Sequence, residues 1–347
     1  MVRGTSVETN VTGDVTARAA SIRDVARRAE VSHQTVSRVL NNHPSIRPET
    51  KQRVLDAIEE LGYRPNRAAR MLVTSRSRTI GILSSSRTQY GPAASIQAIE
   101  VAARASGYSV VTSNLLTTDE GAILAEVDHL VDQAVEGIVV IAPQVRVLDV
   151  LSSLALRVPY VTLQMTDRVI THALSFDQIA GARMATQHLI DLGHRRIYHL
   201  AGPQDWIEAE ARMKGFLQAM SDNDVPTTAP ILGDWTADFG YRAGVELLRY
   251  RDFTAIFSSN DQMALGLMHA VRDAGLDCPR DVSIVGFDDI PEARHFSPPL
   301  TTVRQDFPEL GRRAVALLLA QLDGSEDYRE TIVPELIVRG TTAAPAF

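Results

Sequence analysis

The strongest constraint on the fold is a pattern that repeats from residue 79 towards the C-terminus. A short, continuous apolar run is followed, again and again, by a longer run with helical periodicity. The apolar runs are TIGILSS, YSVVTSN, GIVVIAP, PYVTLQ, RIYHLAG, TAIFSSN and VSIVGFD. Helices separate most of these runs, and are predicted over residues 92–106, 119–133, 178–192, 207–221 and 261–274. This alternation indicates an α/β fold with a parallel sheet covered on both faces. Because the segment is long for one open sheet, we expect two α/β lobes.

Before residue 79 the apolar residues follow a different pattern, with helical periodicity only. Residues 21–62 contain three short helical runs, and a tight turn joins the first two, which is helix-turn-helix spacing. Ser21 with Asp24 resembles a capping box, and Pro48 and Gly62 are typical of the two ends of the third helix. Residues 1–20 read as a disordered tail. The stretch YRPNRAARMLVTSRSR reads as a linker that would accommodate a short helix over residues 66–73.

Charge is divided unevenly along the chain. The whole chain of 347 residues has a formal net charge of −7. Residues 1–78 hold 14 Lys and Arg against 8 Asp and Glu, a net of +6, so the remaining residues carry −13. A basic small unit attached to an acidic body is consistent with a polyanion partner, although solvated surface faces would give the same numbers. There is no apolar run long enough for a membrane span and no secretory signal, and the one cysteine, Cys278, rules out an internal disulfide.

The second helix of the N-terminal unit lies in the stretch VSHQTVSRVLNN. Its apolar residues share one face, and the other face carries His33, Gln34, Thr35, Ser37 and Arg38. All of these side chains can hydrogen-bond to base edges, and Gln and Arg can do so bidentately. Taken alone, each of them could equally be a solvated surface residue.

Common catalytic and cofactor fingerprints are absent. The sequence has no GxGxxG after its first strand and no GxxxxGK[ST], HExxH or GxSxG. Asp288 and Asp289 are adjacent, but neighbouring strand positions point to opposite faces, so they make a poor acid/base pair. We therefore expect no enzymatic activity, no cofactor and no metal site.

Several long motifs occur in an order that resembles the LacI/GalR family of transcriptional regulators. The run IRDVARRAEVSHQTVSRVLNN continues through RPETKQRVLDAIEELGYRPNRAARML and looks like the family's DNA-binding headpiece. The motifs DLGHRRIYHLAGP, SNDQMALG, DVSIVGFDD and PPLTTVRQDFPELG are similar to family signatures in the body. Only residues 1–20 fall outside the resemblance.

The resemblance implies a helix-turn-helix headpiece followed by a two-lobed body like that of periplasmic binding proteins. The implied domains are a tail (1–20), the headpiece (21–64), a hinge helix and linker (65–78) and the body (79–347). Within the body, the first lobe would span about 79–176 plus 306–334, and the second about 177–304 plus 335–345.

For DNA, the resemblance places base-reading positions on the second helix, whose N-terminal residues meet base edges in the major groove. A leucine of the hinge helix, here Leu72, would wedge into the minor groove and bend the DNA. The implied DNA-binding residues are Ser32, His33, Gln34, Thr35, Ser37, Arg38, Asn41, Arg67, Arg70 and Leu72.

For a small ligand, the resemblance implies a sugar site between the two lobes. The implied ligand-binding residues are Ser85, Gln164, Phe176, Arg212, Trp235, Asn260, Asp288 and Gln305. Some positions depart from a galactoside-binding member of the family, which has an aspartate where this chain has Gln164. Gln89, Ser95 and Arg104 also differ, so the wall at the far end of the ligand is altered. The chain stops at VRGTTAAPAF without a leucine heptad, so we expect a homodimer that reads a pseudo-palindromic operator.

These features together predict a cytoplasmic, nucleoid-associated, allosteric repressor of a carbohydrate-utilisation operon, released from DNA by a sugar or glycoside. Within the same family, a regulator that needs a co-repressor or a phosphoprotein partner is the alternative. A sugar-binding transport protein is disfavoured by the basic headpiece and the absence of a signal peptide. An α/β enzyme is disfavoured because a cofactor fingerprint and a spaced carboxylate pair are lacking.

Overall fold

A computed structural model describes residues 20–40, 43–63, 76–85, 88–154, 156, 158–164, 172–324 and 328–346. The chain divides into two compact units, residues 1–77 and residues 78–347, and each is described by itself. Among the described residues, no helix is both long enough and apolar enough to cross a membrane.

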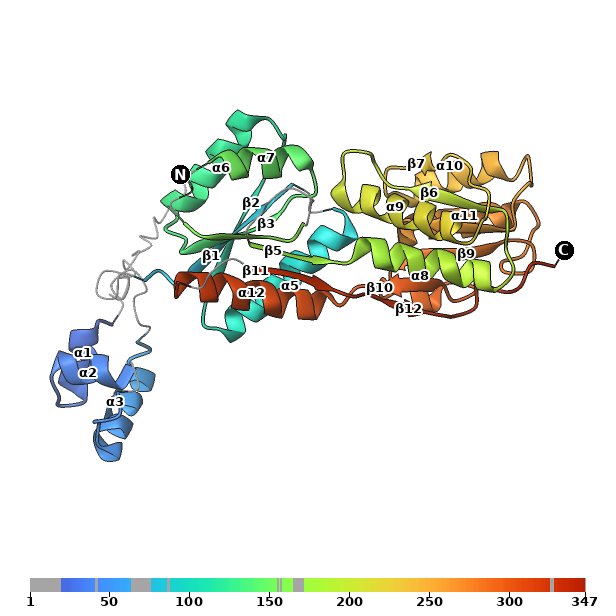
Figure 1. Cartoon of the computed structure of the whole chain (residues 1–347). Coiled ribbons are helices and arrows are strands. Elements are labelled where there is room, and N and C mark those ends of the chain that lie inside the picture. The colour runs from blue at the N-terminus through green and yellow to red at the C-terminus, as the bar shows by residue number, and fades with distance from the viewer. Residues whose placement is uncertain are drawn as a thin grey trace, which may run out of the picture. The chain divides into compact units, whose positions relative to one another are not determined.

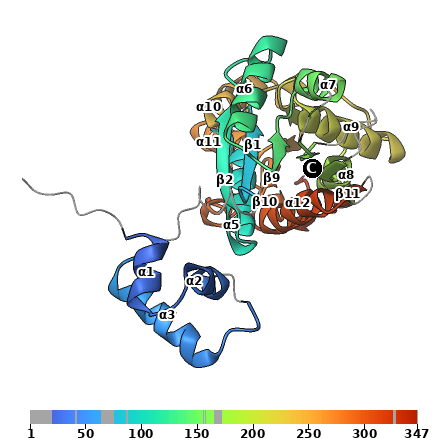
Figure 2. The ribbon, with the colours of Figure 1, turned by 90° about the vertical axis from the view of Figure 1, so that its left-hand side faces the viewer.

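The N-terminal unit contains three helices, α1 (Ile22–Arg28), α2 (His33–Leu40) and α3 (Pro48–Glu60) (Figure 2). They share a small core, in which Val25, Val36 and Val54 from the three helices are fully buried. The predicted capping box is present: the Ser21 backbone N–H donates to the Asp24 carboxylate over 2.9 Å, and the Ser21 hydroxyl accepts from the Asp24 N–H over 3.4 Å. Glu30 adopts a left-handed conformation (φ 54°) in the turn between α1 and α2.

The first lobe of the body is built on a six-stranded sheet with the order β11-β5-β4-β3-β1-β2. Every pairing in it is parallel, which fits the continuous apolar character of the strands. Its strands are β1 (Thr79–Ser84), β2 (Ser109–Asn114), β3 (Gly137–Ile141), β4 (Tyr160–Thr162), β5 (His172–Phe176) and β11 (Tyr328–Ile332). Its helices are α5 (Tyr90–Ala105), α6 (Glu120–Asp132), α7 (Val145–Ser153) and α12 (Phe307–Leu322).

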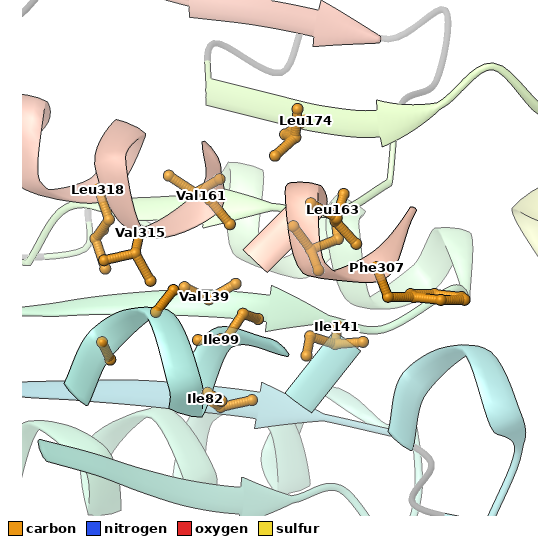
Figure 3. Close-up of a cluster of buried hydrophobic side chains, with 14 of the residues drawn as sticks. Ile82, Ile99, Val139, Ile141, Val161, Leu163, Leu174, Phe307, Val315 and Leu318 are labelled. Carbon is orange, nitrogen blue, oxygen red and sulfur yellow. The ribbon is translucent and has the colours of Figure 1, made fainter. Parts of the chain in front are cut away.

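Strand alternation sends side chains of this sheet into two cores. On β3, Val139 and Ile141 pack with α5 and α12, whereas Ile138 and Val140 pack with α6 and α7. Figure 3 shows the first of these cores, where strand residues meet Ile99 of α5 and Val315 and Leu318 of α12.

The second lobe repeats this architecture with one difference. Its sheet has the order β12-β10-β9-β8-β6-β7, in which β12 pairs antiparallel to β10 and the other pairings are parallel. Its strands are β6 (Ile197–Ala201), β7 (Ile231–Leu232), β8 (Ala255–Ser258), β9 (Ser283–Asp288), β10 (Thr301–Arg304) and β12 (Glu335–Ile337). Its helices are α8 (Gln178–Asp191), α9 (Ile207–Asp222), α10 (Ala237–Leu247), α11 (Asp261–Asp273) and the 3-10 turn η1 (Ala293–His295).

Three chain crossings join the two lobes, as can be followed from green to red in Figure 1. The first runs from β5 to α8, the second from β10 to α12, and the third from β11 to β12. The lobes are therefore discontinuous in sequence, and residues far apart in the chain meet at their junction. This architecture confirms the predicted fold class, an all-helical unit followed by two α/β lobes.

Candidate functional site

The polar face of α2 is exposed, as the amphipathic pattern predicts. Val36 and Val39 are buried in the headpiece core, while His33, Gln34 and Arg38 are exposed. Their side chains are therefore available to a partner, and base edges offer acceptors and donors that match them.

Ser32 and Thr35, at the start of α2, form hydrogen bonds that stabilise the helix itself. The Ser32 hydroxyl accepts from the Thr35 N–H over 3.1 Å, and the two side-chain hydroxyls lie 3.0 Å apart. Ser32 is thus placed as the N-cap that satisfies a free N–H of the first turn. Ser37 is half-buried. The other predicted DNA contacts, Asn41, Arg67, Arg70 and Leu72, lie outside the described residues.

A cavity lies between the two lobes, at the carboxyl ends of several strands, where ligands bind in open α/β sheets. The space between its walls is about 630 Å³ with its open mouth included. Seven of the eight predicted ligand residues line it: Gln164, Phe176, Arg212, Trp235, Asn260, Asp288 and Gln305.

Four of the polar side chains in the cavity form a closed ring of hydrogen bonds. Arg212 Nε donates to Gln178 Oε1 over 2.8 Å, and Gln178 Nε2 donates to Gln305 Oε1 over 2.8 Å. Gln305 Nε2 donates to Asp288 Oδ1 over 2.7 Å, and Arg212 Nη2 lies 3.4 Å from the same oxygen. These side chains come from α9, the start of α8, the β10–α12 crossing and the end of β9. The ring therefore spans two of the three crossings.

Burial sets the electrostatics of this ring. Arg212 and Asp288 are 5% and 6% exposed, so their ion pair is largely removed from water. Burial raises the pKa of Asp288 to about 6, and the neighbouring Arg212 charge and the Gln305 hydrogen bond oppose that rise. Burial also lowers the pKa of Arg212 below its ordinary value, against the pull of Asp288. Arg212 additionally donates to the Ser259 carbonyl and stacks over the Phe287 ring, 3.9 Å from its centroid.

Aromatic side chains form the apolar walls. Phe307 makes edge contacts with Phe176 and Tyr90, with ring centroids 5.4 and 5.6 Å apart. On the opposite lobe, Trp206 and Trp235 meet edge to face at 5.4 Å. A ligand in the cavity therefore has planar polar groups beside ring faces, the combination that suits a sugar.

Trp235 occupies its place through backbone constraints. It has a left-handed conformation (φ 70°), which is unusual for a bulky residue, and Asn260 Nδ2 donates to its carbonyl over 2.9 Å. Asn260 Oδ1 meanwhile accepts from the Met263 N–H and caps α11. Asn260 thus positions Trp235 while it lines the cavity itself.

Two predicted ligand residues, Ser85 and Gln164, differ in their position relative to the cavity. Ser85 is not among the residues that line the cavity, and its hydroxyl donates to Gln144 Oε1 over 2.6 Å. Gln164 does line it, and Gln164 Nε2 donates to Glu208 Oε1 across the lobes over 3.3 Å.

Sequence reasoning missed several lining residues, among them Gln178, Glu208, Trp206, Tyr90 and Phe307. One signal was available, because Glu208 precedes Arg212 by four residues and so shares its face of α9. Nothing local marks Gln178, whose partner Gln305 is 127 positions away. Among the described residues, no cluster of His, Cys, Asp and Glu could hold a metal ion.

An exposed helix-turn-helix face and a two-lobed body with a polar-aromatic cavity define a class: regulators that bind DNA and respond to a small molecule. Residues 21–66 match the family "Bacterial regulatory proteins, lacI family", and residues 186–342 match the "Periplasmic binding protein-like domain". The chain is 36% identical, over 93% of its length and 90% of the relative's, to the lactose operon repressor of Escherichia coli K12. The chain belongs to the lacI family of bacterial regulatory proteins.

Solved structures agree with this assignment. The structure of the Lac repressor dimer bound to operator and the anti-inducer ONPF has a TM-score of 0.85 at 34% identity. That similarity covers 94% of this chain and 100% of the other. The complex of the transcriptional regulator CelR with cellobiose has a TM-score of 0.67 at 31% identity, over 93% of this chain and 99% of that one. The predicted family membership is thereby confirmed, and these relatives are transcriptional regulators rather than enzymes.

Proposed function

We propose that this chain is a transcriptional repressor that is released from its operator by a sugar or glycoside bound between the lobes. The observation that carries the proposal is the largely buried ring of Arg212, Gln178, Gln305 and Asp288 beside aromatic walls. Planar, charge-assisted donors and acceptors grip adjacent hydroxyls, and aromatic faces cover the apolar face of a sugar ring. The cellobiose complex of CelR and the ONPF complex of the Lac repressor support a carbohydrate-type ligand.

On DNA, we propose that the exposed face of α2 reads base edges. Gln34 and Arg38 would supply bidentate contacts, with His33 beside them. Ser32, Thr35 and Ser37 would contact phosphates or cap the helix. Arg67 and Arg70 would contact phosphates or the minor groove, while Leu72 would insert into the minor groove. Two copies of the chain would read the halves of a pseudo-palindrome, as the dimeric Lac repressor bound to its operator suggests. Such a protein would act in the cytoplasm, at the nucleoid.

The sugar acts through a two-state equilibrium. A ligand shifts such an equilibrium only by its differential affinity for the two states. The sugar therefore has to bind best to the lobe arrangement that disfavours DNA binding, and DNA has to weaken sugar binding by the same factor. The Arg212 ring suits this role, because it joins groups from two of the chain crossings between the lobes.

The test measures operator binding against sugar concentration for the parent chain and for Arg212→Ala and Arg212→Lys. The operator is first selected from genomic fragments. Arg212→Ala removes hydrogen bonds from a charged donor, so sugar binding should weaken by about 1.5–3 kcal/mol. Arg212→Lys retains a cation opposite Asp288 but lacks the planar fork, so it should fold and still release DNA poorly. Arg249→Ala, at an exposed surface ion pair, serves as the control.

Both Arg212 variants should repress like the parent but stay on the operator at sugar concentrations that release it. If they release DNA at the parent's midpoint, Arg212 does not contact the sugar. If the sugar instead tightens operator binding of the parent chain, the alternative of a co-repressor-dependent regulator is correct.

A further inference from the structure

Two buried polar atoms in the cavity wall have no hydrogen-bond partner among the described residues. They are Glu208 Oε2, on the first turn of α9, and Trp235 Nε1, in the turn before α10. Buried polar groups are nearly always paired, so each of these atoms calls for an explanation. Both belong to residues that line the same cavity, and one is an acceptor while the other is a donor.

Glu208 is half-satisfied by the protein. Its Oε1 accepts from Gln164 Nε2, which reaches across from the other lobe, while its Oε2 is buried and unpaired. Burial raises the pKa of Glu208 above its ordinary value, and its own backbone N–H, the Arg212 charge and the Gln164 hydrogen bond act against that rise. The Arg212 cation is already paired with Asp288. The cavity lining therefore contains two carboxylates, Asp288 and Glu208, and one cation, Arg212.

Glu208 also stands where two cavities meet. A second cavity, lined by Asp177, Ile179 and Arg329 among others, shares Gln164, Gln178 and Glu208 with the first. Glu208 therefore contributes to the walls of both cavities, beside its contact with Gln164. Its unpaired oxygen belongs to the wall that the two cavities share.

Trp235 presents the complementary atom. Its indole Nε1 can only donate, and its ring is surrounded by the Trp206 ring edge and the Arg212 guanidinium, 5.6 Å from the Trp235 centroid. Neither neighbour supplies an acceptor. Trp235 thus brings an unpaired donor to the cavity wall in addition to an apolar surface.

We propose that Glu208 and Trp235 are a second pair of ligand contacts, which selects a sugar with a hydrogen-bond donor at Glu208 and an oxygen acceptor at Trp235. The proposal rests on the proposed function, because it takes the ligand to be a carbohydrate, and it adds which part of the ligand is read. A deoxy sugar that lacks the donor leaves the Glu208 oxygen buried and unsatisfied, which disfavours binding. A hydroxyl and an ammonium group both supply a donor, so a neutral sugar and an amino sugar are the two sources of this chemistry.

The test is isothermal titration of the full chain with glucose, galactose, their 2-deoxy and 6-deoxy counterparts, glucosamine and galactosamine. The variants are Glu208→Gln, which retains an acceptor without charge, Glu208→Leu, which removes the acceptor, and Trp235→Phe, which removes the indole N–H. Glu210→Gln removes the same charge from the exposed side of α9 and is the matched control. Melting temperatures show that each variant is folded.

One deoxy probe should bind the parent about 10-fold more weakly than its hydroxyl counterpart, and this preference should vanish in Glu208→Leu. If the donor is a hydroxyl, Glu208→Gln should retain part of the preference. If it is an ammonium, the parent should favour an amino sugar, and Glu208→Gln should lose that preference as fully as Glu208→Leu does. Trp235→Phe should abolish the preference for an oxygen at a different position of the sugar.

The Glu208 variants and Trp235→Phe could instead bind every probe with the parent's affinity. That result would overturn this pairing but leave the proposed function intact. A parent chain that binds none of the probes, while still binding an operator, would instead count against a sugar effector and would overturn the pairing with it.

Discussion

At the scale of single residues, burial decides which groups of the body carry charge. His199 on β6 is 1% exposed and stacks against both Phe216 and Phe257, with ring centroids 4.8 and 4.7 Å away. Burial lowers the pKa of His199 to about 4, and the nearby Arg212 acts in the same direction, while a hydrogen bond to the Phe257 carbonyl opposes the shift. The imidazole is therefore neutral in the folded protein at neutral pH.

This neutrality predicts a pH dependence of stability. Because the folded pKa lies below the ordinary 6.5, the contribution of His199 is fully present above pH 6.5 and is lost as the pH falls towards 4. The shift corresponds to about 3 kcal/mol in the free energy of unfolding. Denaturant unfolding between pH 7.5 and 5 should show about 2 kcal/mol of this loss in the parent, and a shallower loss in His199→Gln. His269→Gln, at an exposed histidine, should match the parent, and equal slopes for all three proteins would refute the assignment.

A second residue-scale prediction concerns the DNA face. Gln34→Ala should weaken binding to the selected operator by about 1–3 kcal/mol and leave binding to random DNA almost unchanged, because a base contact carries specificity. Gln52→Ala, at an exposed position on α3, is the control. Gel-shift titrations measure the affinity of each protein for both DNAs. An equal loss of affinity for random DNA would show that Gln34 contacts only phosphates or makes no DNA contact.

At the scale of elements, the sequence pattern predicts long apolar strands and amphipathic helices well. All seven quoted apolar runs contain strands, and the five predicted helices are present, with ends that differ by no more than two residues. The strands β5, β7, β10, β11 and β12 were not among those runs. They are short, or lie at or near a sheet edge, so local hydrophobic periodicity gives them little signal.

The same distinction applies to the cavity. Asn260 and Asp288 can be anticipated from sequence because they follow strands, and carboxyl ends of parallel strands meet at one edge. Gln178 and Glu208 cannot be assigned in this way, since their roles depend on Gln305 and Gln164, residues brought close only by the crossings and the lobe contact.

The turn after β6 carries an element-scale prediction. A Cβ on Gly202 would lie 2.1 Å from the Trp235 ring, so Gly202→Ala should push the ring out of its place. Overpacking of this kind destabilises by about 1–3 kcal/mol. Gly202→Ala should therefore have a lower melting temperature and a weaker sugar affinity. Gly121→Ala on α6, whose Cβ would meet its nearest atom at 3.5 Å, should show neither effect, and a Gly202→Ala protein that equals the parent would exclude this packing constraint.

At the scale of the whole molecule, the proposed repressor depends on a link between sugar and DNA. Leu72 lies outside the described residues, and it is predicted to insert into the minor groove as a wedge. A substitution at Leu72 should therefore affect DNA bending but neither folding nor ligand binding. Leu72→Ala should bind sugar with the parent's affinity and lose operator affinity, because an inserted apolar side chain stabilises the bent DNA. Fluorescence energy transfer across a labelled operator measures the bend, and a bend equal to the parent's would rule out the wedge.

The three crossings between the lobes also constrain how such a gene can be recombined. Neither lobe is encoded by one continuous stretch, because β11 and α12 return to the first lobe after the second has begun, and β12 then returns to the second. A single exchange of DNA with a related gene would therefore cut through a sheet and leave two half-lobes from different parents. A hybrid in which each lobe comes whole from a different parent needs junctions at all three crossings. By contrast, one junction near residue 78 transfers the entire DNA-reading unit, so operator choice can be exchanged far more readily than either wall of the sugar cavity.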